Sequence, residues 1–350
     1  MGGNWELTIE GKDSERSVQQ FDKLMVATGS FNKPKRPDIP GIESFAGDVR
    51  HAITFSPSEA YRNKKVLIVG FHASAVDVAS SLSDIASKLY LSRKNGVVIL
   101  PRYGDDGRTF DQALTLSLSF FQMFAEKYCP KLWFWLLDTM MVKMSKQAFP
   151  EVVEKYGLLP AASVETTTPV IVDQLISQIE SGKADFIGKI EKVTGPKTVQ
   201  LHDGRIIEDL DAIIFCTGYH FSIPFVPKEW DPYPVDGEPP KLYQNIYPLH
   251  SDPDVRNSLA FMGQGAVPVP GFAMFESVAM ATAQIWKGSS KLPPLSEMQG
   301  WYEENLRIYN EKKGRMKTDS TFYPVFLPVE GWWSFLDSNA GTGIMDHFSW

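Results

Sequence analysis

A short glycine turn, Gly70-Phe71-His72-Ala73-Ser74-Ala75, has the residue types that could hold a dinucleotide. Binding a pyrophosphate needs a glycine that lets the backbone approach the phosphates, and a helix start whose free N–H groups meet their charge. Against the pattern G-x-G-x-x-G/A, Gly70 and Ala75 match, whereas His72 stands in place of the second glycine. We therefore predict cofactor contacts from Gly70, His72, Ser74 and Ala75. The alternative is a structural β-α-β turn that has lost this capacity.

Two cations follow the turn at the place that decides between NAD and NADP. In such folds the end of the second strand carries an acidic residue for a ribose 2′-hydroxyl, or a basic residue for a 2′-phosphate. Here Ser92-Arg93-Lys94 supplies two cations and no acid, about twenty residues beyond Gly70. We expect Arg93 and Lys94 to favour NADP. The alternative is a solvated loop that carries two charges.

The elements around this turn are those of a doubly wound sheet. Lys64 to Val69 ends in an apolar run without alternation, which is typical of a parallel strand covered on both faces. Apolar residues then recur at three- and four-residue spacings from Val78 to Ala86, which indicates a helix, and Lys88 to Ser92 is typical of a second strand. The segments together predict one β-α-β unit.

The sequence also contains two copies of one strand-end pattern. Asp22 to Gly29 and Asp211 to Gly218 share an aspartate, an apolar run and a final Thr-Gly. Because the two copies bracket the β-α-β unit, they predict two dinucleotide folds, one interrupted by insertion of the other. Their ends add four candidate cofactor-binding residues: Thr28, Gly29, Thr217 and Gly218.

The segment between the first copy of this pattern, which ends at Gly29, and the β-α-β unit carries a fingerprint. Phe45-Ala46-Gly47-Asp48-Val49-Arg50-His51-Ala52-Ile53-Thr54-Phe55 matches F-x-G-x-x-x-H-x-x-x-F/Y. With this segment the chain resembles the class B flavoprotein monooxygenases, a family that includes the flavin-containing and Baeyer-Villiger enzymes. The resemblance covers most of the chain, from about Phe21 to Gly288, and continues through Phe215 to Tyr219, Leu242 to Pro248 and Leu259 to Gly265.

The resemblance implies an α/β fold with two Rossmann-like dinucleotide-binding domains, in which the NADP domain is inserted in an incomplete FAD domain. Residues 1–44 would be a remnant of the FAD-binding domain, 45–210 the NADP-binding domain with a helical insertion, and 211–350 the return half of the FAD-binding domain with a C-terminal tail. It also implies that Phe45, Gly47 and His51 lie near the nicotinamide and flavin, although Phe45 suits a packing role equally well. Gln264 would lie on the flavin side.

The FAD pyrophosphate turn that the resemblance leads us to expect is not found in this sequence. Gly263-Gln264-Gly265 opens a similar pattern, but Pro268 and Pro270 remove backbone donors where phosphate-binding amides are needed. We therefore expect an N-terminally truncated relative. Three explanations stay open: a shortened gene product, a protein that persists without flavin, or a FAD domain completed by a homo-oligomer or partner chain.

By resemblance, the chain would use NADPH, FAD and O2 to oxygenate nitrogen, sulfur or a carbonyl carbon of an apolar small molecule. The alternative is a non-catalytic homologue that acts as an NADP-binding or scaffold protein. A flavin reductase or oxidase is a third hypothesis, although the missing C-x-x-C pair argues against the disulfide reductases. Since the flavin carries the chemistry in this family, no residue is assigned a catalytic role.

Composition argues against several other classes of function. The net charge of −7 provides no basic field for nucleic acid. Cys129 and Cys216 are the only cysteines, and the six histidines form no metal-ligand spacing, so no metal site is expected. Two isolated cysteines favour a reducing, cytoplasmic compartment, and the N-terminus lacks the charged start and apolar core of a signal peptide.

The most apolar stretch runs from Ala113 to Met144, and charged residues such as Lys131 and Asp138 interrupt it. It contains no run of about 18 uncharged apolar residues, which a membrane-spanning helix would need. We expect a pair of buried or half-buried helices. The alternative is a peripheral contact with a membrane surface.

The remaining segments give weaker signals. Strands are expected at Trp5 to Glu10, Lys23 to Ala27, Phe186 to Val193, Thr198 to His202, Asp211 to Cys216 and Leu259 to Met262. Helices are expected from Val170 to Ile179 and from about Phe272 to a cap at Gly288. An aromatic tail is expected to cover a core, or to face a partner; it includes Trp332, Trp333, Phe335, Phe348 and Trp350.

Overall fold

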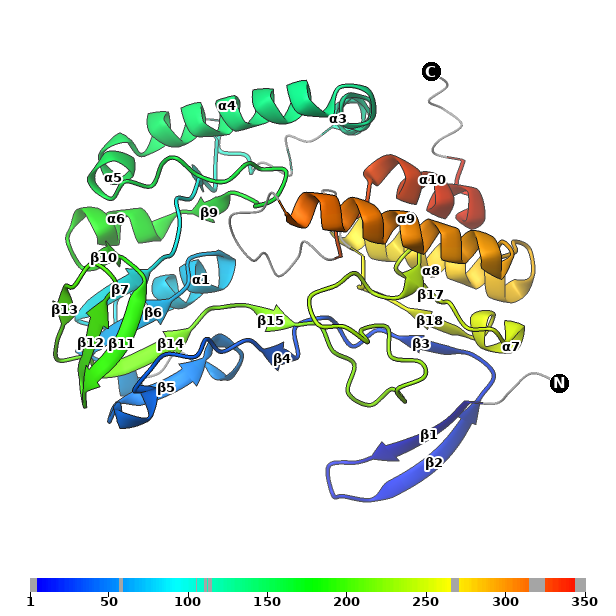
Figure 1. The fold of residues 1–350 in the computed structure, drawn as a ribbon, viewed down its shortest axis with the longest axis horizontal. Helices are drawn as coiled ribbons and strands as arrows, with labels where there is room; N and C mark the ends of the chain where they lie inside the picture. Colours follow the sequence, from blue (N-terminus) through cyan, green and yellow to red (C-terminus); the bar gives the residue numbers. More distant parts are fainter. Residues whose placement is uncertain are drawn as a thin grey trace. The chain divides into compact units, whose positions relative to one another are not determined.

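A computed structural model of the chain describes residues 5–56, 59–104, 106–109, 112, 115–265, 271–314 and 325–343. The chain forms two compact units (Figure 1). Among the described residues, unit 1 contains those up to Asn32 and those from His220 onward, and unit 2 contains Lys33–Tyr219. The predicted domain limits after residues 44 and 210 stay predictions.

Unit 2 is built on a five-stranded parallel sheet in the order β10-β7-β6-β14-β5. The predicted β-α-β unit is confirmed as β6 (Lys65–Val69), α1 (Ala73–Leu82) and β7 (Lys88–Ser92). The other three strands are β5 (Asp48–His51), β10 (Ala184–Ile187) and β14 (Ala212–Phe215).

Both faces of this sheet are covered, which explains the unbroken apolar run of β6. Successive side chains of a strand point to opposite faces. Val66 and Ile68 pack in a cluster with α1, whereas Leu67 packs in a second cluster with β11 (Ile190–Gly195) and β12 (Thr198–Leu201). The latter two strands form an antiparallel sheet with β13 (Ile206–Ile207).

The helical insertion of unit 2 lies between the two strands of a short parallel pair. The expected helix from Val170 to Ile179 is wrong at its beginning, because Val170–Val172 is a strand, β9, that pairs with β8 (Ile99–Pro101). Between the two strands lie α3 (Leu116–Tyr128), α4 (Pro130–Ala148) and α5 (Pro150–Lys155), and α6 (Gln174–Glu180) follows β9. The short elements are β4 (Lys33–Pro34), β15 (Tyr219–His220) and the 3-10 turns Ile42–Ser44, Ala52–Thr54 and Glu59–Tyr61.

Unit 1 contains a parallel pair, β3 (Leu24–Val26) with β18 (Leu259–Phe261); the sequence predicts a strand at each of these two places. Trp5 anchors the hairpin of β1 (Trp5–Glu10) and β2 (Arg16–Phe21), because its Nε1 donates to Ser258 Oγ at 3.0 Å. The other elements are β16 (Leu242–Tyr243), β17 (Tyr247–Pro248), α7 (Pro253–Arg256), α8 (Gly271–Lys287), α9 (Leu295–Lys313) and α10 (Val329–Ala340).

The aromatic residues of α10 cover the core of unit 1, as expected. Trp332 is buried and its Nε1 donates to the Gln244 carbonyl oxygen at 2.9 Å. The ring of Phe335 packs edge-on against Tyr243 and Tyr247. The other predicted tail aromatics Phe348 and Trp350 lie outside the described residues.

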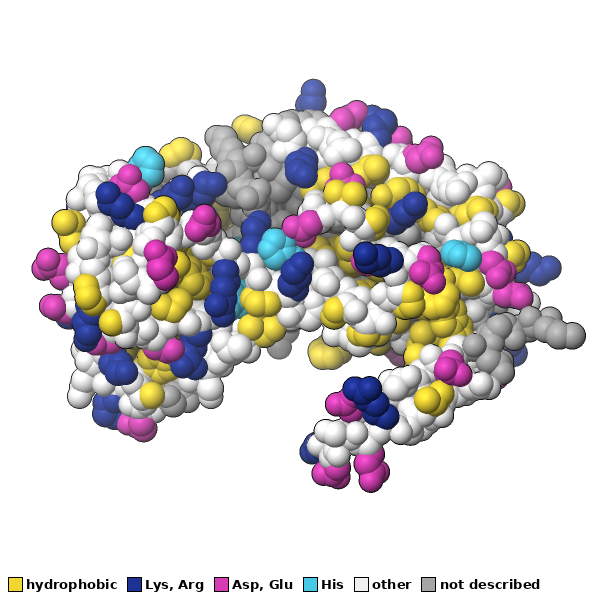
Figure 2. Space-filling model, turned by 60° about the horizontal axis from the view of Figure 1, so that its bottom comes forward, with side chains coloured by type: hydrophobic (Ala, Val, Ile, Leu, Met, Phe, Trp, Pro, Cys, Tyr) yellow, Lys and Arg dark blue, Asp and Glu magenta, His cyan; other side chains and the backbone are white. Residues whose placement is uncertain are grey.

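The surface gives two general observations. On the face drawn in Figure 2, acidic and basic side chains of the described residues are interspersed and form no continuous basic field. Among the helices that the structure describes, none combines the length and apolar character needed to cross a membrane.

Candidate functional site

The turn after β6 lies at the carboxyl ends of three parallel strands. Gly70 adopts φ 102°, a value that side-chain-bearing residues rarely reach, and a Cβ there would lie 2.4 Å from the Cys216 carbonyl oxygen. Its N–H donates to the Ser92 carbonyl at the end of β7. Only glycine therefore lets the turn pass between the ends of β7 and β14, where ligands bind in doubly wound folds.

The start of α1 has two N–H groups available for an anion. His72 is the N-cap residue, and its carbonyl accepts from the amides of Ala75 and Val76. Within the described part of the chain, the N–H groups of Ala73 and Ser74 donate to no acceptor. Such open amides at the positive end of a helix suit a phosphate. The turn therefore fits a pyrophosphate in spite of the histidine.

The His72 side chain lies in contact with another segment of unit 2. Its Nε2 is 2.9 Å from Thr168 Oγ1, in the loop that precedes β9. Burial lowers the pKa of His72, although the contact with Thr168 opposes this shift. The imidazole is therefore mainly neutral at neutral pH, and it gives the helix no side-chain cap.

The two predicted cations differ in their surroundings. Arg93 donates from Nη1 to the Asn95 carbonyl at 2.9 Å, and from Nη2 to the carbonyls of Gly157, at 3.1 Å, and Tyr156. Its guanidinium also lies over the Phe186 ring, and burial lowers the pKa of Arg93. Lys94 is exposed. Arg93 thus fixes the loop after β7 to the end of α5, while Lys94 faces solvent beside it.

The Phe45 and Gly47 positions of the fingerprint are explained by packing. Phe45 is buried in the cluster on one face of the sheet. A Cβ on Gly47 would lie 2.4 Å from the Asp211 carbonyl oxygen and 2.5 Å from Phe45 Cε1. The small residue lets the chain approach the start of β14, where the Asp48 amide donates to Asp211.

His51 joins the fingerprint to the second Thr-Gly strand end. It is the last residue of β5 and lies at the same sheet edge as Gly70, because β14 pairs with both β5 and β6. Its Nδ1 accepts from the Ile53 amide, so Nε2 carries the proton and donates to the Gly218 carbonyl at 3.0 Å. His51 is fully buried, and burial lowers its pKa, although the bond to Gly218 opposes this shift.

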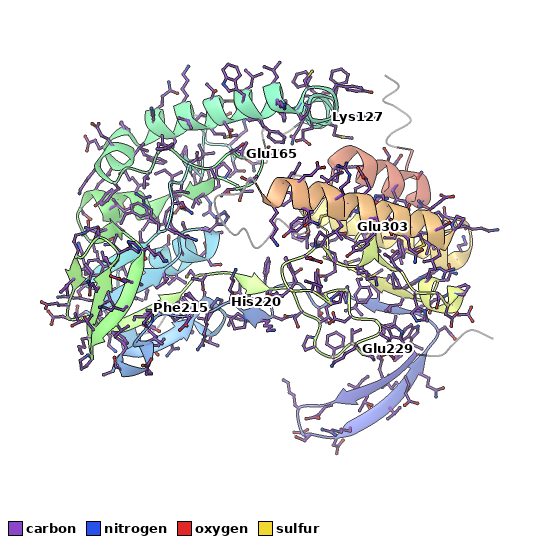
Figure 3. The ribbon with its side chains drawn as sticks, viewed as in Figure 1. Lys127, Glu165, Phe215, His220, Glu229 and Glu303 are labelled. Atoms are coloured by element: carbon purple, nitrogen blue, oxygen red, sulfur yellow. The ribbon has the colours of Figure 1, made fainter. Side chains whose placement is uncertain are left out.

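The Gly218 carbonyl is held from two sides. Besides the bond from His51, it accepts from the Lys35 amide at 2.9 Å, and the Thr217 hydroxyl donates to the Lys35 carbonyl. Gly218 adopts φ 80°. Thr217 and Gly218 therefore hold the chain that leaves β14, shown with Phe215 labelled in Figure 3, against the segment before the fingerprint.

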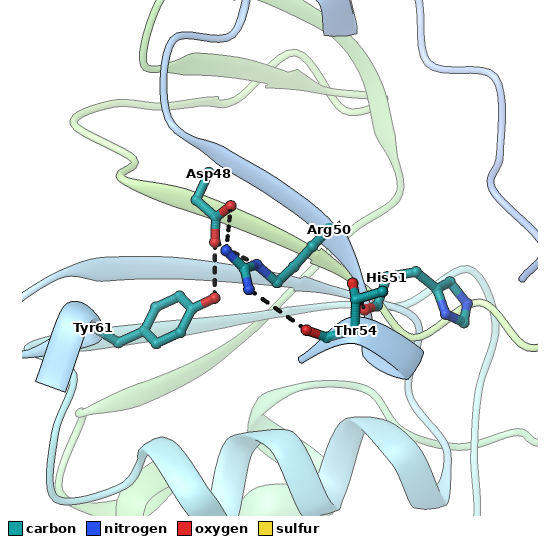
Figure 4. A network of polar contacts seen from close by, with 5 residues as sticks. All are labelled: Asp48, Arg50, His51, Thr54 and Tyr61. Carbon is teal, nitrogen blue, oxygen red and sulfur yellow. Dashed lines mark hydrogen bonds and ion pairs between the residues drawn. The ribbon is translucent and has the colours of Figure 1, made fainter. Parts of the chain in front are cut away.

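A polar network in the fingerprint was not predicted from the sequence. Asp48 accepts from Arg50 at 2.6 and 2.9 Å and from the Tyr61 hydroxyl at 2.8 Å (Figure 4). Burial and the Asp48 carboxylate raise the pKa of Tyr61 to about 12, and although burial opposes it, the bonds from Arg50 and Tyr61 lower the pKa of Asp48. The available signal was the i, i+2 spacing of Asp48 and Arg50, which places both on one face of β5.

The candidate residues of unit 1 lie at the ends of β3 and β18. The Met262 amide donates to Val26, and Ser30 Oγ donates to the Gly263 carbonyl at 2.7 Å, so the two parallel strands end side by side. Thr28 and Gly29 are exposed at this edge, and Gly29 adopts φ 77° with open space around its missing Cβ. This edge is the position of a ligand in doubly wound folds.

Gln264, predicted to lie on the flavin side, is buried and bonded within unit 1. Its Oε1 accepts from the Tyr233 hydroxyl at 2.5 Å, and its Nε2 donates to the Met262 carbonyl at 3.3 Å. The Gln264 carbonyl accepts from Asn245 Nδ2. The Gln264 side chain therefore holds the residues just after β18 in place.

The structure therefore groups the predicted residues in two sets. Unit 2 brings together the Gly70 turn, Arg93, Lys94, His51 and the Thr217-Gly218 strand end, and unit 1 brings together Thr28, Gly29 and Gln264. Among the described residues, no group of three or more His, Cys, Asp or Glu side chains could hold a metal ion.

We expect buried His51 to make stability dependent on pH. Because its pKa is lower in the folded state, the unfolded chain takes up the proton more readily below its ordinary value of 6.5. Stability should be full above that value and fall as the pH drops through the folded-state pKa. Thermal melting between pH 5 and 8 should show a smaller loss on acidification for His51→Gln, since glutamine does not titrate. If the melting temperature of His51→Gln falls with pH as steeply as that of the wild type, the assignment is contradicted. His72→Gln is the companion variant, because the pKa of His72 is also lowered.

Comparison with known families gives a match over nearly the whole chain. The model of the family described as "FMO-like: Flavin-binding monooxygenase-like" matches residues 1–323. "Monooxygenase aurF" of Gibberella zeae is 31% identical over 99% of this chain and 66% of its own length. "Flavin-containing monooxygenase 3" of Homo sapiens is 26% identical over 93% of this chain and 59% of its own length. The chain thus spans about three fifths to two thirds of these relatives.

Solved structures show the same fold. Cyclohexanone monooxygenase from Rhodococcus sp. Phi1, bound to NADP+, has a TM-score of 0.64 at 13% identity, with 98% of this chain and 76% of that chain covered. S-allyl-L-cysteine S-oxygenase from Allium sativum has a TM-score of 0.60 at 20% identity, with 97% and 58% covered. The predicted α/β fold with two Rossmann-like domains is confirmed. By its fingerprint, its fold and the family match, the chain belongs to the flavin-binding monooxygenase-like family.

Proposed function

We propose that the chain functions as an NADPH- and FAD-dependent monooxygenase that transfers oxygen from O2 to nitrogen, sulfur or a carbonyl carbon of an apolar small molecule. The observation that carries the proposal is the turn after β6. It places Gly70 and the open amides of Ala73 and Ser74 at one sheet edge with fingerprint residue His51. The family match and the NADP+-bound neighbour support the same reading.

In this proposal unit 2 holds NADPH. Gly70 lets the backbone approach the pyrophosphate, and the amides of Ala73 and Ser74 donate to its oxygens. Lys94, exposed beside the end of β7, meets the ribose 2′-phosphate, and Arg93 keeps the loop in place through its bonds to the end of α5. Ser74 and Ala75 belong to the first turn of α1, so their positions follow from the same cap.

The proposal places FAD against unit 1, at the ends of β3 and β18. Thr28 and Gly29 are exposed there, and the positive φ and open surroundings of Gly29 suit a close approach of the backbone to a ligand. When bound, FAD supplies the redox and oxygen chemistry, so the chain needs to bind, orient and shield the reactants. Gln264 fixes the residues just after β18 through its bonds to Tyr233 and Met262.

The fingerprint has a positioning role in this proposal. His51 holds the Gly218 carbonyl, and the Asp48–Arg50–Tyr61 network stiffens the strand that carries His51. The NADP-binding domain would then extend over residues 45–210 and the FAD-binding domain over the segments on either side. A rigid connection between the end of β14 and the segment before β5 would keep the Gly70 turn and the fingerprint in fixed positions relative to each other.

Reconstitution with FAD tests the proposal. The purified protein is titrated with FAD, followed by the quenching of flavin fluorescence, and then mixed with NADPH in air together with an amine, a thioether or a ketone. We expect saturable FAD binding and substrate-dependent consumption of both NADPH and O2. Saturable NADPH binding with no FAD binding would leave an NADP-binding protein without monooxygenase activity, and would overturn the proposed function.

A further inference from the structure

His72 occupies the position in the turn between β6 and α1 where dinucleotide-binding folds carry a second glycine. That glycine lets the backbone approach the pyrophosphate, so a side chain at this position borders the place where the phosphates bind. The His72 backbone is extended, with φ −149° and ψ −167°, and its carbonyl accepts from the amides of Ala75 and Val76. Histidine therefore fits the turn without backbone strain, and its side chain is an added group next to the open amides of Ala73 and Ser74.

The two large side chains of the turn have different neighbours. The Phe71 ring packs edge-on against Phe186, with ring centroids 4.6 Å apart, in the cluster that includes the buried face of α1. The His72 imidazole contacts Thr168 instead, with Nε2 2.9 Å from Oγ1. Because the imidazole is only partly buried, it can exchange this partner for a bound ligand without disturbing the core.

The loop that carries Thr168 is held in place by its own bonds. The Val164 amide donates to Asp138 Oδ1 on α4 at 2.8 Å. The Thr167 amide donates to the Ser163 carbonyl at 3.0 Å. The Thr168 hydroxyl is therefore a fixed partner, and the imidazole is the group of this pair that can turn.

The charges around the turn do not set the protonation of His72. The elements that contact α1 include β6, β9, α6 and the 3-10 turn Ala52–Thr54. The charged and titratable side chains on α1, on these elements and on the segments that border the turn are Lys65, Asp77, Glu180, Asp173, Glu165, His51, Arg93, Lys94, Cys216 and Tyr219. The pKa of His72 lies below its ordinary value because of burial, the contact with Thr168 opposes this shift, and none of these charges contributes. Protonation would therefore add a positive charge that the turn lacks when it is empty.

We infer that His72 leaves Thr168 and, in its protonated form, donates to the pyrophosphate of the nicotinamide cofactor, so that cofactor binding takes up a proton. This inference rests on the function proposed above, because it concerns the same cofactor. The negative charge of the pyrophosphate favours the protonated imidazole, which gives His72 a higher pKa in the complex than in the free protein. The gain in affinity is full below the pKa of the free protein and disappears as the pH rises through the pKa of the complex.

Isothermal titration calorimetry of the full chain with NADP+ tests the inference, because NADP+ has the same pyrophosphate and is stable in mild acid. Titrations in buffers of different ionisation enthalpy give the number of protons taken up. We expect about half a proton or more per NADP+ at pH 7 in the wild type. Between pH 6 and pH 8, the affinity of the wild type should fall by about tenfold more than that of His72→Gln.

Two histidine variants give the reference for this measurement. His72→Gln removes the titrating group, so proton uptake should fall by the amount that His72 contributes. The 2′-phosphate of NADP+ also titrates, at about pH 6, but it does so with both proteins and is removed by the comparison. His202→Gln is the matched control, because His202 is an exposed histidine that follows β12, and it should take up protons as the wild type does.

Thr168→Val tests the exchange of partners independently of the histidine. Valine has nearly the shape of threonine without the hydroxyl, so the imidazole loses its partner in the free protein. NADP+ should then bind about threefold more tightly at pH 6, and proton uptake should persist. Circular dichroism melting of each variant shows whether the fold is retained.

The possible failures can be told apart. Equal proton uptake by the wild type and His72→Gln, or loss of proton uptake in Thr168→Val, overturns the inference and leaves the proposed function in place. Absence of NADP+ binding to the wild-type protein at both pH 6 and pH 8 overturns the inference and the proposed function together.

Discussion

Gly70→Val is expected to abolish NADPH binding and to lower the free energy of unfolding by about 3 kcal/mol or more. The first side-chain carbon would lie 2.4 Å from the Cys216 carbonyl oxygen, which belongs to the backbone after β14 and has no rotamer by which to move away. The glycine also holds φ 102°, which valine does not tolerate. The turn would have to shift, and the open amides of Ala73 and Ser74 would move with it.

Gly204→Val is the matched control for the Gly70 variant. Gly204 adopts φ 86° in the turn between β12 and β13, and nothing lies within 4 Å of the position of its missing Cβ. This variant introduces backbone strain without steric overlap, so it should keep NADPH binding. Thermal melting and NADPH titration of both variants separate the steric overlap from the strain. NADPH affinity at the wild-type level in Gly70→Val would contradict the assignment of the turn.

The second large effect is expected from Arg93→Ala, which should both destabilise unit 2 and weaken NADPH binding. Loss of the guanidinium removes its hydrogen bonds to the carbonyls of Tyr156, Gly157 and Asn95, at a cost of about 2 kcal/mol or more. The loop that carries Lys94 also loses its attachment to the end of α5. NADPH affinity should therefore fall more than NADH affinity, because the 2′-phosphate is the group that this loop meets.

Lys94→Ala separates affinity from stability. Lys94 is exposed, so its removal should leave the melting temperature nearly unchanged. NADPH binding should weaken by about tenfold while NADH binding stays the same, because one charge-assisted contact to a phosphate is lost. If Lys94→Ala leaves the NADPH affinity at the wild-type value, the lysine does not meet the 2′-phosphate.

The local sequence was sufficient for the elements around the turn. An unbroken apolar run predicts a strand buried on both faces, and β6 packs between two clusters for that reason. The Gly70 turn and the following helix were also predictable, because glycine at positive φ and a helix face of small apolar residues leave clear local signals. The fingerprint before β6 was recognised in a different way, by its match to a motif of the family that the chain resembles.

Pairings between distant segments could not be predicted. Val170–Val172 forms a strand only because β8 lies beside it, and a three-residue apolar run does not distinguish this from a helix start. Arg93 bonds to carbonyls 63 and 64 residues away, so the sequence suggested a phosphate ligand and gave no sign of its structural role. The protonated nitrogen of His51 likewise follows from its contacts with Ile53 and Gly218.

Titration of the wild-type protein with NADPH and with NADH, followed by nicotinamide fluorescence, tests most directly whether the turn between β6 and α1 binds a phosphorylated dinucleotide. We predict saturable binding of one NADPH per chain, and an affinity for NADH that is lower by about tenfold or more. The absence of saturable NADPH binding, or equal affinities for the two nucleotides, would contradict the account.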